Sequence, residues 1–173
     1  MVIILTGNGK GKTSAALGLA LRAVGRENNV LMVQFIKGPW LSGEHESCKK
    51  LDPKFKIIKT GKGFVGIGDD KHPRSEHVKA AEDGLALAEK EVMSGAWNVL
   101  ILDEIWNALS LRLLTHKKIS EFIEITKPLV DHLILTGRGC TPEFIAAADL
   151  VTEMREIKHP FSKGVPAAAG IDF

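Results

Sequence analysis

The stretch TGNGKGKTS, residues 6–14, directly follows the apolar run VIIL and limits the fold more than any other part of the sequence. A phosphate-binding loop has a glycine, four residues of any kind, and then glycine, lysine and serine or threonine. Residues 11–13 match the end of this pattern, but Thr6 stands where the first glycine belongs and Gly7 comes one position late. The stretch is therefore either a coincidence or a specialised phosphate-binding loop.

A buried strand before this stretch and an alanine- and leucine-rich helix after it favour phosphate binding over a plain glycine-rich turn. Glycines allow backbone N–H groups to turn inward as a nest for anions, and the helix adds its positive N-terminal end. Lys12 would then reach the terminal phosphates, and the hydroxyl of Thr13 would bind magnesium. The residues expected to bind the nucleotide are Gly7, Asn8, Gly9, Lys10, Gly11, Lys12 and Thr13.

A second buried strand ends in two acids. The run NVLILDE, residues 98–104, places Asp103 and Glu104 where their carboxylates could hold a magnesium ion or its waters. A hydrophobic run that ends in an acid is a weak signal alone, but it becomes a strong one beside a phosphate-binding loop. The sequence therefore predicts a magnesium site made by Thr13, Asp103 and Glu104.

Short apolar runs alternate with helical patterns along the chain. The runs expected to form strands are residues 2–6, 30–36, 55–59, 99–102, 132–136 and 150–157. The expected helices, with caps at Ser75, Thr115 and Thr141, are residues 12–25, 76–93, 116–127 and 142–148. This alternation predicts one α/β domain over residues 1–173, a doubly wound, mainly parallel sheet of about six strands flanked by helices, of the phosphate-loop NTPase, RecA-like type. The remaining long stretches, residues 38–50 and 61–74, are expected to be functional loops.

The composition is that of an ordinary soluble protein, with 45% apolar residues, 25% charged residues and a formal net charge of +2. No basic run or stripe indicates a nucleic-acid partner. No apolar stretch approaches the ~20 residues that cross a bilayer, so no membrane partner is expected. The first residues enter a strand without a signal region, and Cys48 and Cys140 are interpreted as free thiols. A cytoplasmic location is expected.

Two other patterns carry less weight. Residues 61–66, GKGFVG, satisfy the dinucleotide-binding fingerprint, but that fingerprint must open a helix, and residues 68–73 end in a proline instead. Dinucleotide binding is therefore not expected. His45, His72 and His77 do not belong to a closed set of four zinc ligands, and they are interpreted as scattered exposed imidazoles.

Five segments, in order over nearly the whole chain, resemble the ATP:corrinoid adenosyltransferases, also called cob(I)alamin adenosyltransferases. They are TGNGKGKTSAALGLALRAVG, VQFIKG, ILDE, LTGRG and REIKHPFSKGV…GIDF. The variant phosphate loop is itself typical of that family. The resemblance implies that ATP is held reversed relative to ordinary phosphate-loop ATPases, with its ribose 5′-carbon facing the corrinoid. A Co(I) corrinoid then attacks this carbon, a cobalt–carbon bond forms, and inorganic triphosphate leaves.

The resemblance implies that Lys10, Lys12 and Glu104 are catalytic. Negative charge grows on the departing triphosphate, and the two lysines, the backbone nest and magnesium at Thr13 and Glu104 would stabilise it. The cobalt nucleophile carries no proton, so a general base is not expected.

The resemblance also implies that Phe64 and Arg138 bind the corrinoid. In some members of the family a second aromatic residue stands where this chain has Gly66, and the two aromatics are thought to displace the lower ligand of the corrinoid. Trp40 or Trp106 could replace that second aromatic here. The alternative for Phe64 is that it only packs its own loop.

Mg²⁺ is the implied cofactor, with ATP as co-substrate and a reduced corrinoid as the other substrate, and a homodimer is the implied assembly. The chain has no C-x-x-C pair, flavin fingerprint or iron–sulfur spacing, so an external reductant such as a small flavoprotein is expected. Two other functions stay open at this point: a phosphate-loop ATPase or kinase with ordinary phosphoryl chemistry, and a nucleotide-dependent binding module without chemistry.

Overall fold

The computed structural model describes residues 1–40, 42–68 and 70–171. Its centre is a six-stranded sheet in the order β3-β2-β4-β5-β1-β6, in which all neighbouring strands are parallel. The strands are β1 (Val2–Thr6), β2 (Val30–Gln34), β3 (Phe55–Lys59), β4 (Val99–Asp103), β5 (His132–Thr136) and β6 (Leu150–Glu153). The predicted α/β fold with a parallel, doubly wound sheet is confirmed.

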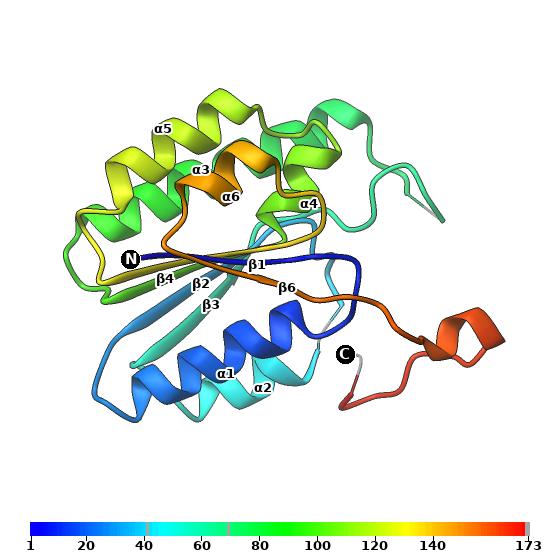
Figure 1. Cartoon of the computed structure of the whole chain (residues 1–173), viewed down its shortest axis with the longest axis horizontal. Coiled ribbons are helices and arrows are strands. Elements are labelled where there is room, and N and C mark those ends of the chain that lie inside the picture. Colours follow the sequence, from blue (N-terminus) through cyan, green and yellow to red (C-terminus); the bar gives the residue numbers. More distant parts are fainter. Residues whose placement is uncertain (41, 69, 172–173) are drawn as a thin grey trace.

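Helices cover both faces of this sheet (Figure 1). One face carries α1 (Lys12–Val24) and α2 (Gly43–Lys49). The other face carries α3 (Arg74–Met93), α4 (Ile105–Ser110), α5 (His116–Thr126) and α6 (Pro142–Ala147). A short 3₁₀ helix, η1 (Pro160–Lys163), follows β6. None of the helices in the described ranges is long and apolar enough to cross a membrane.

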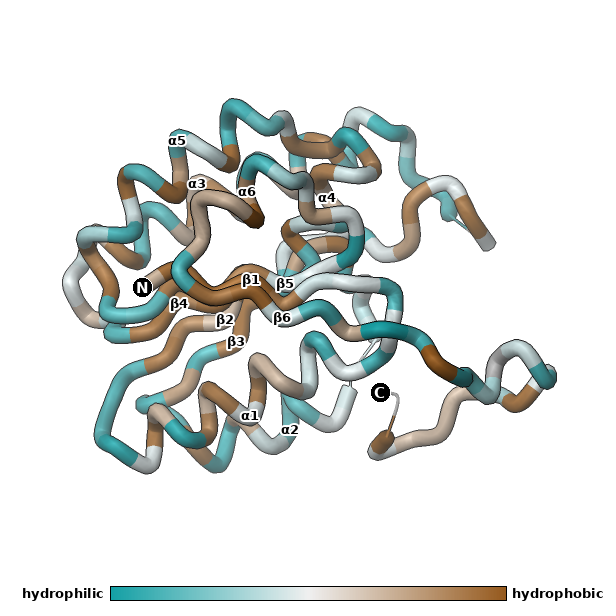
Figure 2. Tube along the Cα trace, in the orientation of Figure 1, coloured by the Kyte–Doolittle hydropathy of each residue, from teal (hydrophilic) through white to brown (hydrophobic). Residues whose placement is uncertain are grey.

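The inner strands are almost entirely buried because helices cover them on both sides. Every residue of β1, β2 and β4 is buried, whereas the edge strand β6 is mostly exposed. Figure 2 shows the apolar strands as a brown layer between the helices. Ala16 and Ala20 of α1 are completely buried, and their small side chains allow this helix to pack closely on the sheet. The continuous apolar runs of the sequence therefore form the core.

Two strands are shorter than predicted. The second was expected to reach Ile36 but ends at Gln34, and Ile36 has the left-handed φ of 63° that interrupts a strand. The sixth was expected to reach residue 157 but ends at Glu153, which pairs with Thr6, the last residue of β1. Beyond that point β1 offers no further backbone for pairing.

Two short α-helices in the described part of the chain were not predicted. Residues 38–50 were expected to be a loop, but α2 begins in it, after a reciprocal cap between Ser42 and His45. The second, α4, follows directly on β4. The long helix α3 also starts earlier than expected, because Pro73 and not Ser75 is its cap, whereas Thr115 caps α5 through a bond from the backbone of Lys118 as predicted.

Candidate functional site

The predicted phosphate-binding loop, residues 7–11, connects β1 to α1 at the carboxyl edge of the sheet. Gly7 has a φ of 96° and Gly11 a φ of 110°, a conformation that side chains rarely allow. The chain after β6 lies against this loop, because Gly9 N donates a 2.7 Å hydrogen bond to Met154 O. A Cβ on Gly7 would come within 2.4 Å of that same carbonyl oxygen. The late glycine of the pattern is therefore needed for both the turn and the close approach of Met154.

The ammonium group of Lys12 lies over this loop. Its Nζ donates 2.7 Å hydrogen bonds to the carbonyl oxygens of Gly7 and Gly9. Burial and then the positive charge of Arg138 lower the pKa of Lys12, and the carboxylates of Glu104 and Asp103 oppose this shift. The structure thus brings together the loop lysine, the two acids after the buried strand and the arginine after β5.

Asp103 is completely buried and accepts hydrogen bonds at both carboxylate oxygens. Oδ1 accepts from the hydroxyls of Thr13 (2.9 Å) and Thr136 (2.7 Å), and Oδ2 accepts from Gln34 Nε2 (3.2 Å). Burial raises the pKa of Asp103, while the hydrogen bonds lower it. The predicted proximity of Thr13 and Asp103 is therefore a direct contact.

Glu104 occupies a strained position between β4 and α4. Its φ is 64°, in the left-handed region, and its backbone N–H donates a 3.0 Å hydrogen bond to Thr136 Oγ1. Such a conformation in a non-glycine residue costs about 1–3 kcal/mol and often occurs at functional sites. Burial and then the negative charge of Asp103 raise the pKa of Glu104. Nearby positive charges, those of Lys37, Lys12 and Arg138, oppose the shift.

The oxygen atoms of Thr13, Asp103 and Glu104 fit a magnesium ion. They are hard donors, and Mg²⁺ in nucleotide sites needs only one or two protein ligands beside phosphate oxygens and water. Within residues 1–40, 42–68 and 70–171, no cluster of three His, Cys, Asp or Glu side chains forms a complete metal cage. This donor set therefore suits a metal that arrives with a nucleotide. Asp103 already accepts three hydrogen bonds, so the carboxylate of Glu104 is more available to a metal ion.

Two exposed residues of the loop, Asn8 and Lys10, complete the predicted nucleotide-binding set. Lys10 Nζ donates a 3.0 Å hydrogen bond to the carbonyl oxygen of Ile171. The segment after η1 therefore returns to the phosphate-binding loop, near the start of α1 (Figure 1).

Arg138 lies on the loop after β5, and α4 fixes its backbone. Its N–H donates a 2.7 Å hydrogen bond to Asn107 Oδ1, and its carbonyl oxygen accepts a 3.2 Å hydrogen bond from Ser110 Oγ. The side chain is exposed, and its charge acts on both Lys12 and Glu104. The structure thus places Arg138 at the same edge of the sheet as the phosphate-binding loop.

Phe64 and Trp40 form an exposed aromatic pair on two neighbouring loops. Their ring centroids are 5.7 Å apart, and Phe64 is 61% exposed and Trp40 63% exposed. The ring of Trp40 lies on Gly38, where a Cβ would come within 2.2 Å of it. Trp106, the alternative second aromatic, has no exposed surface and packs on Phe144, so that alternative is wrong. The first turn of α4 points Trp106 into the core.

The interpretation of the histidines as exposed was wrong for two of them. His45 is half-buried, and its Nε2 lies 2.8 Å from Gln34 Oε1. His77 is only 3% exposed and lies against Asp70. His72 is exposed as expected and contacts Glu76. Burial of a histidine depends on tertiary packing, which its polar sequence neighbours did not reveal.

Gln34 is a site residue that the sequence analysis did not identify. It has no exposed surface, and its amide joins Asp103 to His45. One signal could have found it: the run VLMVQ ends in a polar residue after a buried strand, just as VLILD does. In the sheet, Gln34 pairs with Asp103 in register.

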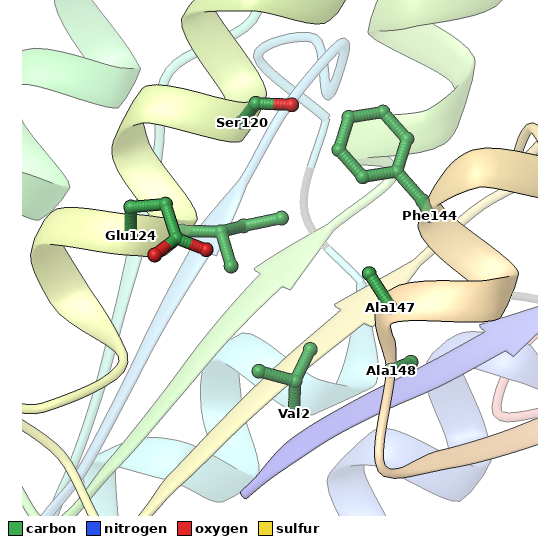
Figure 3. A pocket seen from close by; sticks show the side chains of 7 residues that line it. Val2, Ser120, Glu124, Phe144, Ala147 and Ala148 are labelled. Carbon is green, nitrogen blue, oxygen red and sulfur yellow. The ribbon is translucent and has the colours of Figure 1, made fainter.

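A small cavity lies away from this site, between α5 and α6 (Figure 3). Its volume is about 70 Å³, and Val2, at the amino end of β1, forms part of its wall. The phosphate-binding loop follows the opposite end of the same strand. This cavity has room for water-sized molecules but not for a nucleotide.

Comparisons with known proteins agree with this geometry. The family described as ATP:corrinoid adenosyltransferase BtuR/CobO/CobP matches residues 1–173. A corrinoid adenosyltransferase of Escherichia coli K12 is 34% identical over 173 residues, which cover 100% of this chain and 85% of the relative. Corrinoid adenosyltransferase CobA of Salmonella typhimurium LT2 has the same identity and coverage. A corrinoid adenosyltransferase of Pseudomonas aeruginosa is also 34% identical, over 100% of this chain and 83% of the relative.

Proposed function

The chain belongs to the ATP:corrinoid adenosyltransferase family, and from this we infer how its residues divide the work of adenosyl transfer. The protein is an enzyme that transfers the adenosyl group of ATP to a corrinoid. The full-length family match carries this conclusion, and the contact between Thr13 and Asp103 supports it. An ordinary phosphate-loop ATPase or kinase is not favoured.

In the proposed reaction, the Co(I) corrinoid attacks the ribose 5′-carbon of ATP. The cobalt–carbon bond forms with the electron pair of Co(I), and the bond from the 5′-carbon to oxygen breaks. The electron pair of the broken carbon–oxygen bond leaves with inorganic triphosphate. The phosphate-binding loop therefore holds a leaving group, and residues 7–13 provide its nest of backbone N–H groups.

Lys12 and Lys10 stabilise the charge that grows on the triphosphate. Support for Lys12 comes from its partly buried ammonium, since a charge acts more strongly where water is excluded. Support for Lys10 comes from its position on the same loop, beside the returning C-terminal segment. Bound triphosphate would compete with the backbone carbonyls that these two ammonium groups contact.

Thr13, Glu104 and Asp103 are the proposed magnesium-binding residues. Glu104 binds the ion or its waters most directly, and Asp103 orients the hydroxyl of Thr13. When bound with ATP, magnesium would neutralise part of the negative charge on the triphosphate. The donor chemistry described above supports this assignment.

Phe64 and Trp40 are the proposed apolar face for the corrinoid. Two aromatic rings that are each more than 60% exposed and lie against one another are costly in water, which supports a ligand that covers them. That face would hold the cobalt without its lower ligand and exclude water from beneath it. Arg138 is proposed to bind the corrinoid, and its exposed position on the loop after β5, at the same edge of the sheet, supports this role.

The remaining parts of the proposal concern the oligomeric state, the location and the electron donor. One domain, residues 1–173, carries the activity as a homodimer in the cytoplasm. An external donor such as a small flavoprotein supplies the electron that makes Co(I), because the sequence has no flavin fingerprint or iron–sulfur spacing of its own.

One assay tests the reaction directly. The protein is incubated with ATP, magnesium and chemically reduced cobalamin, and the spectrum is followed for the alkyl-cobalt product. Triphosphate should appear in equal amount. Release of orthophosphate without an alkyl-cobalt spectrum would instead identify an ordinary phosphate-loop ATPase.

A further inference from the structure

Two ionisable residues that the proposed reaction does not use, Asp70 of the loop between β3 and α3 and His77 of α3, have buried side chains that contact each other. The side chain of His77 is 2% exposed and that of Asp70 is 8% exposed. His77 Nε2 lies 3.0 Å from Asp70 Oδ2 and 3.1 Å from Asp70 Oδ1. Asp and His are rarely buried without a partner, because an unpaired polar group in the interior is costly. Separating Asp70 from His77 would therefore leave a buried polar group without a partner, which favours the contact between them.

Asp70 also closes the loop on itself. Its Oδ2 accepts a 2.8 Å hydrogen bond from Gly66 N, and its Oδ1 accepts a 3.0 Å hydrogen bond from His72 N. One carboxylate thus holds three groups: the backbone on each side of it and a side chain of α3. Since an ionised carboxylate only accepts hydrogen bonds, His77 donates from Nε2.

The two residues of the pair belong to different kinds of structure. His77 lies in the first turn of α3, a helix of 20 residues whose inner face packs in the core. Asp70 lies in the glycine-rich loop, which projects at the carboxyl side of the sheet (Figure 1). The pair therefore ties a loop to a firmly packed helix.

Apart from the contacts of Gly63 and Phe64 with Trp40, the described residues of the loop around Phe64 make few contacts that could fix it. Gly63, Gly66 and Gly68 all have positive φ values, which gives the unfolded loop many alternative conformations. Phe64 and Ile67 are each more than 60% exposed, so their side chains bury little apolar surface. Val65 alone of these neighbours packs partly against the core. The hydrogen bond from Gly66 to Asp70 fixes the backbone two residues after Phe64.

We propose that Asp70 and His77 are positioning residues, which hold the loop in the conformation that places Phe64 against Trp40 and thereby set the affinity for the corrinoid. Neither residue touches the corrinoid or ATP in this role. The inference depends on the proposed function of Phe64 in corrinoid binding. Beyond that function, Asp70 and His77, which are not part of the apolar face, keep Phe64 and Trp40 in their positions.

The test compares the KM for the corrinoid with the KM for ATP, using chemically prepared Co(I). Asp70→Ala and His77→Phe should each raise the corrinoid KM about tenfold, the effect of losing one well-placed aromatic contact, and leave the ATP KM within about twofold. His77→Gln retains a donor near Nε2 and should restore most of the affinity. Lys79→Ala, on the exposed face of the same helix, is the control and should behave like the wild type.

A double variant shows whether the pair acts through Phe64. Phe64→Ala alone should raise the corrinoid KM, and Asp70→Ala should add little in that background, because coupled residues are not additive. Binding of cob(II)alamin without ATP, followed by absorbance, should give the same pattern of affinities. This binding measurement can also be made on a variant whose turnover is too slow for a KM.

Three results would overturn the inference. In the first, Phe64→Ala raises the corrinoid KM but Asp70→Ala and His77→Phe do not, and the proposed function then survives alone. In the second, the corrinoid and ATP KM values rise together, which indicates general loss of structure. In the third, Phe64→Ala leaves the corrinoid KM unchanged, and the proposed corrinoid role of Phe64 then fails together with the inference.

Discussion

The hydroxyl of Thr13 donates a 2.9 Å hydrogen bond to Oδ1 of Asp103, across 90 positions of sequence. This contact joins the phosphate-binding loop after β1 to the acidic end of β4, although β5 lies between the two strands in the sheet. Both residues follow or end strands that point the same way, so the parallel sheet brings them to one edge. Thr136, at the end of β5, donates to the same oxygen and completes the connection.

Lys12→Ala should lower turnover with Co(I) cobalamin by at least ~100-fold, because it removes a partly desolvated positive charge that faces several phosphate charges. The unfolding midpoint should change little, since Lys12 contacts carbonyl groups of its own loop. Lys117→Ala, on the exposed face of α5, is a suitable control and should keep normal turnover. Near-normal turnover of the Lys12 variant would remove the loop from the mechanism.

Glu104→Gln should weaken magnesium-dependent activity more than Asp103→Asn does, because the carboxylate of Glu104 is more available to a metal ion. Asp103→Asn should instead lower stability more, because a buried amide cannot accept all three hydrogen bonds that the carboxylate accepts. Titration of activity with free Mg²⁺, together with urea unfolding, separates the two effects. A greater loss of magnesium dependence in the Asp103 variant would reverse the assignment.

Gln34→Leu should lower the free energy of unfolding by about 1–3 kcal/mol, because it leaves groups on Asp103 and His45 without a partner in the interior. Urea unfolding measures this change. His45→Gln is the matched comparison, since a glutamine amide can still donate toward Gln34, and it should cost less. An unchanged stability of the Gln34 variant would show that water or the neighbouring residues replace its bonds.

The fold could be predicted from the sequence, because continuous apolar runs and glycines at strand ends are local signals. The proximity of Thr13 and Asp103 could also be predicted, since a loop after one buried strand and an acid at the end of another lie at the same edge of a parallel sheet. The roles of Gln34, His45 and His77 could not be read in the same way. Each depends on a partner that folding brings close, such as Asp103 for Gln34 and Asp70 for His77.

The pH dependence of stability should reveal Asp70. Hydrogen bonds from the backbone of Gly66 and then of His72 lower the pKa of Asp70 from its ordinary value of 3.8 to about 2. Because the folded pKa is the lower one, this carboxylate stabilises the folded state fully above about pH 5, and the contribution is lost as the pH falls toward 2. The difference in unfolding free energy between the wild type and Asp70→Asn should therefore shrink from pH 5 to pH 3. Urea unfolding at several pH values measures it, and a constant difference would contradict the assigned hydrogen bonds.

Phe64→Ala should slow adenosylation strongly when the cobalt arrives as Co(II) with a protein electron donor. Its exposed ring, 5.7 Å from that of Trp40, is the proposed apolar face that holds the cobalt without its lower ligand before reduction. When Co(I) is prepared chemically, the ligand is already displaced, and the same variant should lose much less activity at saturating corrinoid. Parallel rates of adenosylcobalamin formation in the two assays measure the difference. Trp40→Ala should share the pattern, because it removes the ring on which Phe64 lies, and Ile67→Ala is the exposed control on the same loop. Equal losses of the Phe64 variant in both assays would mean that Phe64 only packs its loop.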